Sequence, residues 1–307
     1  MDVTVVGAGI VGLTTALTLE ERGHRVRIVA RASALECVSG VAGALWFPYR
    51  AGPPERVVAW AARTRVWLES LAHDREAGID LLTGYEITDE ADDAAPPWWA
   101  ASLEVARVPA PVRGAPLAWR FRAPRVEPAR FVRWISSRLR ASIERREVRE
   151  LADEAGDAVI DCTGLGAREL ARDESLQPLL GQVVLTERGG ADPAITIADE
   201  RDPDAIFYVI PRREELVLGG CSVPWPPGET PRIDPALTAR ILDQARAHGI
   251  GVGAVREVRV GLRPFRPEVR VERDSAEPRV IHSYGHGGAG YTVCRGCAED
   301  VAAMLGG

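Results

Sequence analysis

A glycine-rich turn close to the N-terminus constrains the fold of this chain more than any other stretch. The apolar segment Asp2–Val6 runs into Gly7-Ala8-Gly9-Ile10-Val11-Gly12 and then into a helical run from Leu13 to Arg22. A second apolar segment, Arg25–Val29, follows after a short break. Strand, tight glycine turn, helix and strand in this order are typical of the βαβ unit that binds a dinucleotide.

The three glycines have separate roles in such a unit. Gly7 permits the sharp turn, Gly9 lets the backbone approach a pyrophosphate, and Gly12 lets the helix pack closely on the strand. The helix N-terminus then presents N–H groups and the positive end of its dipole to phosphates. An acidic residue usually follows the second strand, but here the sequence has Ala30-Arg31. Arg31 is compatible with the 2′-phosphate of NADP or with a position along the adenosine, so this stretch leaves the dinucleotide open.

Composition excludes several classes of protein. The chain has 307 residues, 46% of them hydrophobic, which is enough for one or two domains with a substantial core. A net charge of −6 gives no basic field for nucleic acid. Five scattered cysteines do not form a disulfide framework and indicate a reducing, cytoplasmic location. We expect no signal peptide and no membrane span. All 38 basic residues are arginine, so catalysis through a lysine side chain, such as a Schiff base, is excluded.

Hydrophobic periodicity predicts the remaining elements. The expected helices are Glu55–Ala72, one from Glu127, one from Ala167, Leu237–Ala245 and Cys294–Leu305. The expected strands are Leu117–Arg122, Val148–Glu150, Ala158–Cys162, Val255–Leu262 and Val280–Ser283. Residues 80–126 are expected to form short strands and loops, and Gln182–Gly220 an antiparallel sheet. Segments of the βαβ type therefore alternate with antiparallel segments. We expect an α/β protein with a Rossmann-like nucleotide-binding domain (1–50, 140–180 and 263–307) and an interleaved antiparallel-sheet domain (51–139 and 181–262).

Two stretches near the C-terminus carry residues suited to chemistry. Gly261-Leu262-Arg263-Pro264-Phe265-Arg266-Pro267 places an arginine, Arg263, just after a predicted strand. Tyr284-Gly285-His286-Gly287-Gly288-Ala289-Gly290-Tyr291-Thr292 is predicted to be a second glycine loop between the last strand and the last helix. Backbone N–H groups of such a loop can face carbonyl or phosphate oxygens.

The chain resembles the D-amino-acid oxidase family of FAD flavoproteins, which includes D-aspartate oxidase. The matching stretches, in family order, are Val5–Leu13, Leu45-Trp46-Phe47-Pro48-Tyr49, Asp161-Cys162-Thr163-Gly164, Tyr208-Val209-Ile210-Pro211, Gly261-Leu262-Arg263-Pro264 and Ile281–Gly288. They span almost the whole chain, and the last two are the most specific. The resemblance implies that the nucleotide-binding domain holds FAD and that the other domain binds substrate.

The resemblance also implies catalytic roles. Arg263 matches the arginine that binds the substrate α-carboxylate through two hydrogen bonds. Tyr208 matches the tyrosine whose hydroxyl donates to the same carboxylate, and Gly288 matches the position whose carbonyl accepts from the substrate amine. A D-amino acid held in this way passes a hydride from Cα–H to flavin N5. The products are an α-keto acid and ammonia, and O₂ becomes hydrogen peroxide.

The same resemblance implies a set of cofactor-binding residues and no metal site. These residues are Gly7, Ala8, Gly9, Ile10, Val11, Gly12, Arg31, Ala32, Gly43, Ala44, Leu45, Val148, Thr163, Gly164, Gly287, Gly288, Ala289, Gly290, Tyr291 and Thr292. The expected partners are a D-amino acid and O₂, with a homodimer as one option for assembly.

The chain departs from the family in two places. Mammalian members have a second tyrosine on an active-site lid, whereas Asp202–Ala205 has no aromatic residue, which implies a more open pocket. The histidine of aspartate-preferring members is absent near Phe47 and Tyr49. Neutral D-amino acids are therefore favoured as substrates. The arginines that remain as alternative partners for a side-chain carboxylate are Arg50, Arg212 and Arg213.

Other titratable residues have structural interpretations. His286 is predicted to be a structural member of the cofactor loop, and His24, His73 and His248 to be solvated. Cys294 and Cys297 have CxxC spacing without a metal or thioredoxin-like context, so we predict no redox role. The alternative functions are a D-aspartate oxidase, a glycine or sarcosine oxidase, an amine dehydrogenase, an NADP-dependent reductase that uses Arg31, and a nucleotide-binding protein without turnover.

Overall fold

The computed structural model describes residues 1–89 and 95–306, and the chain divides into two compact units. Unit 1 comprises Met1–Ile79, Val126–Pro178 and Arg263–Gly307, and unit 2 comprises Asp80–Arg125 and Leu179–Leu262. The predicted α/β class, with a Rossmann-like part and an interleaved antiparallel part, is confirmed. The boundaries differ from the predicted ones at 51–79 and 126–139, which belong to unit 1 because their helices pack on other helices of that unit.

The sheet of unit 1 is mainly parallel, and it has the strand order β13-β14-β7-β1-β2-β6. Its strands are β1 (Asp2–Val6), β2 (Arg25–Ala30), β6 (Ile143–Arg145), β7 (Ala158–Asp161), β14 (Val280–His286) and the C-terminal part of β13 (Val255–Arg273). β14, β7, β1, β2 and β6 run parallel, and β13 is antiparallel to β14. Continuous apolar runs form the central strands because both faces of a parallel sheet are covered.

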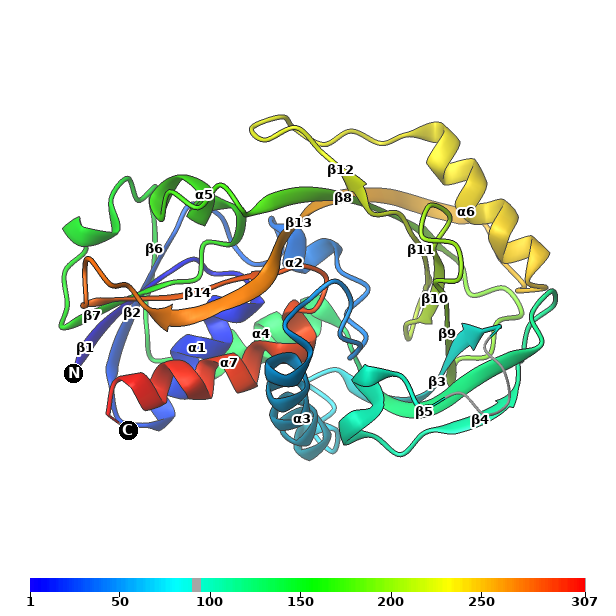
Figure 1. The fold of residues 1–307 in the computed structure, drawn as a ribbon, viewed down its shortest axis with the longest axis horizontal. Coiled ribbons are helices and arrows are strands. Elements are labelled where there is room, and N and C mark those ends of the chain that lie inside the picture. Colours follow the sequence, from blue (N-terminus) through cyan, green and yellow to red (C-terminus); the bar gives the residue numbers. More distant parts are fainter. Residues whose placement is uncertain (90–94, 307) are drawn as a thin grey trace. The chain divides into compact units, whose positions relative to one another are not determined.

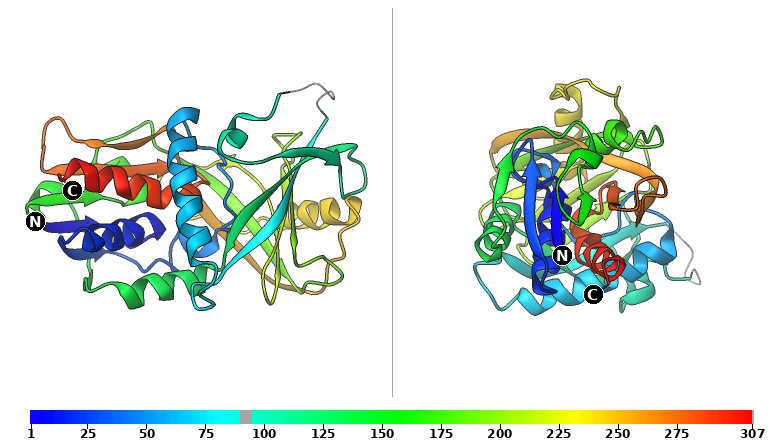
Figure 2. Two further views of the ribbon diagram at one scale, coloured as in Figure 1. Left: turned by 90° about the horizontal axis from the view of Figure 1, so that it is seen from below. Right: turned by 90° about the vertical axis from the view of Figure 1, so that its left-hand side faces the viewer.

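Helices cover this sheet (Figure 1). They are α1 (Ile10–Glu21), α2 (Val38–Val41), α3 (Pro54–Leu71), α4 (Pro128–Arg138), α5 (Ala167–Leu170) and α7 (Gly290–Met304), with 3₁₀ turns at Leu151–Asp153 and Gly164–Gly166. α1 and α7 lie side by side, and α3 crosses α7 (Figure 2). Proline in the first turn of α3 and of α4 starts both helices, since its missing N–H has no intrahelical partner there.

Unit 2 is built on a largely antiparallel sheet of order β4-β5-β3-β9-β10-β11-β8-β13, with β12 beside β8. Its strands are β3 (Ile79–Thr88), β4 (Ala106–Pro109), β5 (Leu117–Val126), β8 (Gln177–Thr186), β9 (Ile195–Asp199), β10 (Phe207–Pro211), β11 (Leu216–Gly219) and β12 (Val223–Pro224), and a 3₁₀ turn covers Trp98–Ser102. Helix α6 (Pro235–Ala247) packs beside β10 and β11 (Figure 1). Ile241 and Ala245 of α6 join Phe207 and Val209 of β10 in one buried cluster.

Several predicted boundaries are wrong. Val148–Glu150 is not a strand; the strand is the exposed edge strand β6, which has no apolar pattern, and Val148 packs into a cluster with Val6 and Val159. Arg263 lies within β13 rather than after a strand. The predicted second glycine loop is shorter, because Tyr284–His286 belongs to β14 and α7 begins at Gly290.

Smaller differences concern helix ends, and part of one prediction is not covered. α1 begins at Ile10 rather than Leu13, α5 has only four residues, and Val38–Val41 forms the short helix α2, which the sequence pattern did not indicate. β9 was not singled out by the sequence pattern. Residues 90–94 of the region expected to form short strands and loops lie outside the described residues.

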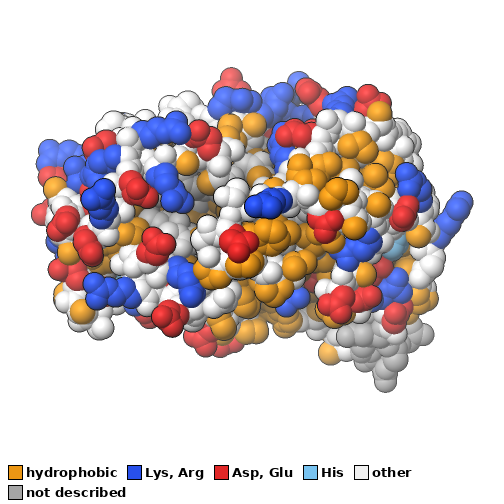
Figure 3. All heavy atoms as spheres, turned by 90° about the horizontal axis from the view of Figure 1, so that it is seen from above, with side chains coloured by type: hydrophobic (Ala, Val, Ile, Leu, Met, Phe, Trp, Pro, Cys, Tyr) orange, Lys and Arg blue, Asp and Glu red, His pale blue; other side chains and the backbone are white. Residues whose placement is uncertain are grey.

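The surface carries charges of both signs. Arginine and acidic side chains are interspersed around an apolar area on the face in Figure 3. The structure has many ion pairs between such groups, for example Arg63 with Asp300 and Arg295 with Glu21. Among the residues that the structure describes, no helix has both the length and the apolar character needed to cross a membrane.

The crossing of α3 and α7 depends on Gly296. A Cβ at this position would lie 2.4 Å from the Cα and carbonyl oxygen of Trp60. Gly296→Ala is therefore expected to lower the free energy of unfolding by about 1–3 kcal/mol, because backbone on both sides must move. Urea unfolding followed by tryptophan fluorescence measures this change. Gly190→Ala, whose Cβ would meet nothing within 4 Å, is the control; equal losses in the two variants would contradict the packing argument.

Candidate cofactor and substrate site

The turn between β1 and α1 is sterically closed to side chains. Gly7 has a φ of +109°, and a Cβ on it would lie 2.4 Å from the carbonyl oxygen of Cys162. A Cβ on Gly12 would lie 1.9 Å from the carbonyl oxygen of Gly7. The predicted requirement for glycine at both positions is thus explained by backbone contacts inside unit 1. At Gly9 the nearest atom to a Cβ would be the hydroxyl oxygen of Ser39, at 3.3 Å.

Ser39 is a residue of this site that the sequence did not indicate. Its buried hydroxyl oxygen accepts a hydrogen bond from the N–H of Ile10 at 3.0 Å, at the start of α1. Its carbonyl oxygen accepts from the hydroxyl of Tyr291 at 3.0 Å. The first N–H groups of a helix have no intrahelical partner, and Ser39 satisfies one of them. The α1 N-terminus is thereby attached to the first turn of α7.

The Thr163–Gly164 turn, at the carboxyl end of β7, is held by a buried carboxylate. Oδ1 of Asp161 accepts from the N–H and the hydroxyl of Thr163, at 3.1 and 2.7 Å. Oδ2 of Asp161 lies 3.1 Å from Nδ1 of His282, whose Nε2 lies 2.9 Å from Asp274. The hydrogen bond from His282 contributes most to lowering the pKa of Asp274 to about 2. This arrangement holds the turn beside Gly7.

The second glycine loop folds back on the segment that contains Tyr49. The N–H of Gly288 donates to the carbonyl oxygen of Tyr49 at 3.2 Å, and the N–H of Gly287 donates to that of Pro264 at 2.9 Å. A Cβ on Gly288 would lie 2.6 Å from the ring of Tyr49, and one on Gly287 would lie 2.0 Å from the carbonyl oxygen of Arg50. Only glycines allow the Gly287–Gly288 segment to lie so close to the backbone of Tyr49 and Arg50.

Arg263 reaches the same tyrosine. Its guanidinium carbon lies 5.6 Å from the centre of the Tyr49 ring, within range of a cation–π contact. The structure therefore brings Arg263 and Gly288 together around Tyr49, inside unit 1. Tyr208 belongs to unit 2, where its ring covers Gly219: a Cβ on Gly219 would lie 2.1 Å from it.

The other predicted cofactor-binding residues differ in their surroundings. Arg31 is exposed and lies 3.8 Å from the carboxylate of Glu147. Ala44 has a φ of +59°, and its carbonyl oxygen accepts from the N–H of Val126 at 2.9 Å. The hydroxyl of Thr292 exchanges hydrogen bonds with the backbone of Phe47. Ala289 and Gly290 start α7, Ala32 follows β2, Gly43 and Leu45 flank Ala44, and Val148 lies in an apolar cluster.

His286 is buried with an unsatisfied polar atom. The residue is 3% exposed, and its Nε2 has no hydrogen-bond partner among the described residues. Burial lowers its pKa to about 4, so the ring is neutral near pH 7. The prediction that His248 is solvated is wrong: its ring bonds to Asp199 and stacks on Phe207.

The cysteines of the CxxC pair are buried thiols. Burial raises the pKa of Cys294 to about 11 and also raises that of Cys297, so both stay protonated. In the described part of the chain, no group of three or more His, Cys, Asp or Glu side chains is arranged to hold a metal ion.

Taken together, the glycine turn at the carboxyl ends of parallel strands and the adjoining helix N-terminus define a dinucleotide-binding protein. The chain belongs to the FAD dependent oxidoreductase family, whose model matches residues 2–304.

Comparison with known proteins covers nearly the whole chain. It is 39% identical to a D-amino-acid oxidase of Rubrobacter xylanophilus, over 98% of this chain and 95% of that protein. It is 37% identical to a D-amino-acid oxidase of Streptomyces coelicolor, over 99% of this chain and 96% of that protein. The fold is similar to that of glycine oxidase from Bacillus cereus, with a TM-score of 0.79 and 19% identity over 99% and 95% of the two chains.

The buried His286 predicts a pH dependence of stability. Its pKa is about 4 in the folded chain against 6.5 when exposed, so below pH 6.5 the unfolded chain binds a proton that the folded chain does not. Stability should therefore fall by on the order of 3 kcal/mol between pH 6.5 and pH 4 through this residue alone. Urea unfolding of the wild type and of His286→Gln at several pH values measures it. The variant should show a flatter profile, and parallel profiles would contradict the assignment.

Proposed function

We propose that this protein is a D-amino-acid oxidase, which uses FAD to deaminate D-amino acids oxidatively to α-keto acids and ammonia, with release of hydrogen peroxide. The observation that carries the proposal is the grouping of Arg263 and Gly288 around Tyr49. A cation and an exposed backbone carbonyl on one short stretch of surface match the carboxylate and the amine of an α-amino acid. The identity with the bacterial D-amino-acid oxidases supports the same substrate class.

FAD is the cofactor of the family, and the residues of unit 1 fit it. We assign the pyrophosphate to the turn Gly7–Gly12, where the first N–H groups of α1 and its dipole favour an anion. The buried Nε2 of His286, which has no partner within the described chain, indicates polar contact with a bound group. We assign the isoalloxazine to the Gly287–Thr292 segment. When bound, FAD supplies the two-electron acceptor for the oxidation and passes the electrons to O₂.

The role of the protein in this reaction is orientation. The planar guanidinium of Arg263 matches a carboxylate with two parallel hydrogen bonds, and the carbonyl oxygen of Gly288 can accept from the amine. We assign a third hydrogen bond, to the carboxylate, to the hydroxyl of Tyr208 from its sequence motif. With the carboxylate and the amine both held and the flavin on one side of Cα, only one enantiomer directs its Cα–H toward the flavin.

No acid–base side chain is required in this scheme. His286 is the histidine closest in sequence to Gly288, and with a pKa of about 4 it is a weak base. The substrate amine must be neutral for the Cα–H bond to break as a hydride, and solvent takes up its proton. The imino acid product then hydrolyses in water.

Neutral side chains are favoured in the substrate. Arg212 is paired with Glu215 at 2.8 Å, and Arg213 lies 3.3 Å from Asp80, which also pairs with Arg125, so both arginines already have an acidic partner. A substrate side-chain carboxylate would have to displace an acidic partner.

The five cysteines form no disulfide in the structure, which supports a reducing compartment such as the cytoplasm.

Replacing the proposed anchor tests this function. Arg263→Ala should lower kcat/KM for D-alanine by a factor on the order of 10²–10³, equivalent to about 3–4 kcal/mol, chiefly through KM. The flavin absorbance of the purified variant should be unchanged. Arg259→Ala, on the same strand but paired with Glu257, is the control. Unchanged kinetics in Arg263→Ala would exclude the assigned role.

A substrate panel tests the side-chain preference. Peroxide release from D-alanine should exceed that from D-aspartate by roughly tenfold or more in kcat/KM, since a side-chain carboxylate that reaches Arg212 or Arg213 must displace an acidic partner. L-Alanine should give no turnover. Faster oxidation of D-aspartate would instead identify a D-aspartate oxidase, and preference for glycine would identify a glycine oxidase.

A further inference from the structure

The segment of β13 that follows Arg263 is poorly held by backbone pairing. Pro264 and Pro267 have no N–H to donate, and the register with β14 shifts between Phe265 and Arg270. The backbone contacts at this irregularity include the Phe265–His286 pair and the hydrogen bonds from Gly287 N–H to Pro264 and from Val269 N–H to Gly52. A strand interrupted in this way needs side-chain contacts to keep one conformation.

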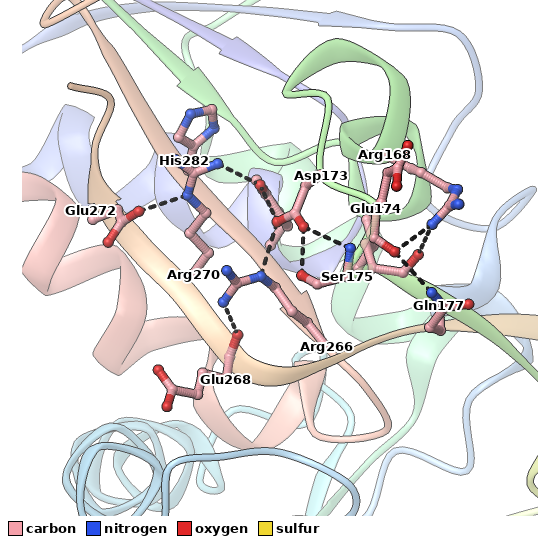
Figure 4. Close-up of polar contacts among 12 residues, drawn as sticks. Arg168, Asp173, Glu174, Ser175, Gln177, Arg266, Glu268, Arg270, Glu272 and His282 are labelled. Atoms are coloured by element: carbon pink, nitrogen blue, oxygen red, sulfur yellow. Dashed lines mark hydrogen bonds and ion pairs between the residues drawn. The ribbon is translucent and has the colours of Figure 1, made fainter. Parts of the chain in front are cut away.

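Asp173, on the loop after α5, supplies such contacts (Figure 4). Its Oδ2 accepts from Nε of Arg266 at 2.9 Å and from the hydroxyl of Tyr284 at 2.8 Å. Tyr284 is fully buried on β14, and its hydroxyl also accepts from Arg270 at 2.8 Å. One carboxylate oxygen therefore joins the irregular segment of β13 to β14. We call Asp173, Arg266, Tyr284 and Arg270 the Asp173 cluster.

The carboxylate of Asp173 is itself fixed by hydrogen bonds within its own loop. Oδ1 of Asp173 accepts from the N–H and the hydroxyl of Ser175. Arg168 of α5 donates to the carbonyl oxygens of Glu174 and Leu176, at 2.7 and 2.9 Å (Figure 4). Burial opposes ionisation of Asp173, but the hydrogen bonds from Ser175, Tyr284 and Arg266 outweigh it and hold its pKa at about 2. The group is therefore an anion at neutral pH.

The cluster lies next to both proposed substrate contacts along the chain. Arg266 is three residues after Arg263, and its side chain packs on Gly285, where a Cβ would lie 2.8 Å from that of Arg266. Gly285 is three residues before Gly288. Asp173 adds a side-chain tie between Arg266 and β14 to the backbone contacts near this point, which include the Phe265–His286 pair and the Gly287–Pro264 hydrogen bond.

We propose that Asp173 is a positioning residue that, through Arg266 and Tyr284, sets the position of Arg263 relative to the carbonyl of Gly288 and thereby determines carboxylate affinity. This inference rests on the proposed function of Arg263. Asp173 does not touch the substrate in this scheme. It acts by holding the two stretches of backbone that do.

The test is Asp173→Asn in the FAD-loaded enzyme, since an amide has one acceptor oxygen in place of two and cannot accept from both Arg266 and Ser175. KM for D-alanine should rise about tenfold, with kcat within about threefold of the wild type, because a displaced anchor weakens binding. The Kd of propionate, which has the carboxylate of D-alanine but no amine, should rise by a similar factor when followed by flavin absorbance. If Asp173→Asn does not fold, Arg266→Met keeps the stem over Gly285, removes the same hydrogen bond and should give the same result.

Asp74 offers a matched control. One oxygen of its carboxylate also accepts from an arginine and an aromatic donor, Arg138 at 3.0 Å and Trp134 at 2.7 Å. Asp74→Asn should lower the melting temperature to a similar extent as Asp173→Asn and leave KM and the propionate Kd unchanged. Equal KM values in the two variants would overturn the positioning role. A wild type and Asp74→Asn that both fail to oxidise D-alanine would instead overturn the proposed function, and the inference with it.

Discussion

The close approach of α1 to β1 is the constraint on which the rest of unit 1 depends. At Gly7 and Gly12 the two backbones leave no room for a Cβ, so the start of α1 lies at the carboxyl end of β1. Parallel pairing brings the end of β7 to the same edge, with Val6 opposite Asp161. A helix N-terminus and two turns therefore meet at one place, which is where an open α/β sheet binds its ligand.

Polar side chains accept hydrogen bonds from backbone and side-chain donors at this edge of the sheet. Ser39 accepts from the N–H at the start of α1, and Asp161 accepts from Thr163 in the turn after β7. Asp173 does the same for the proline-interrupted part of β13. Each of these groups is a hydrogen-bond acceptor placed where a turn or an irregular strand has donors without regular partners. The site is thus built on rigid elements that are joined by a few buried acceptors.

The sequence predicted structure correctly where the interactions that determine it lie between residues close together in the chain. The spacing of Gly7, Gly9 and Gly12 indicates a steric requirement within six residues, and the structure shows the expected clashes for Gly7 and Gly12. It failed where partners are distant in sequence. Val148 was assigned to a strand because an apolar residue indicates a buried position, but burial does not distinguish a strand from a loop. Ser39 and Asp173 bond to residues 29 and 93 or more positions away, and no periodicity marks such pairs.

The last forty-five residues of the chain have a consequence for how the protein is made. β14 lies between β13 and β7 in the strand order of unit 1, and α7 packs against α1, although α1 is synthesised first and α7 last. The N-terminal glycine turn leaves the ribosome long before the strand and helix that enclose it. Unit 1 can therefore close around a flavin only after both segments of unit 2 have been synthesised, because Arg263–Gly307 follows them in the chain.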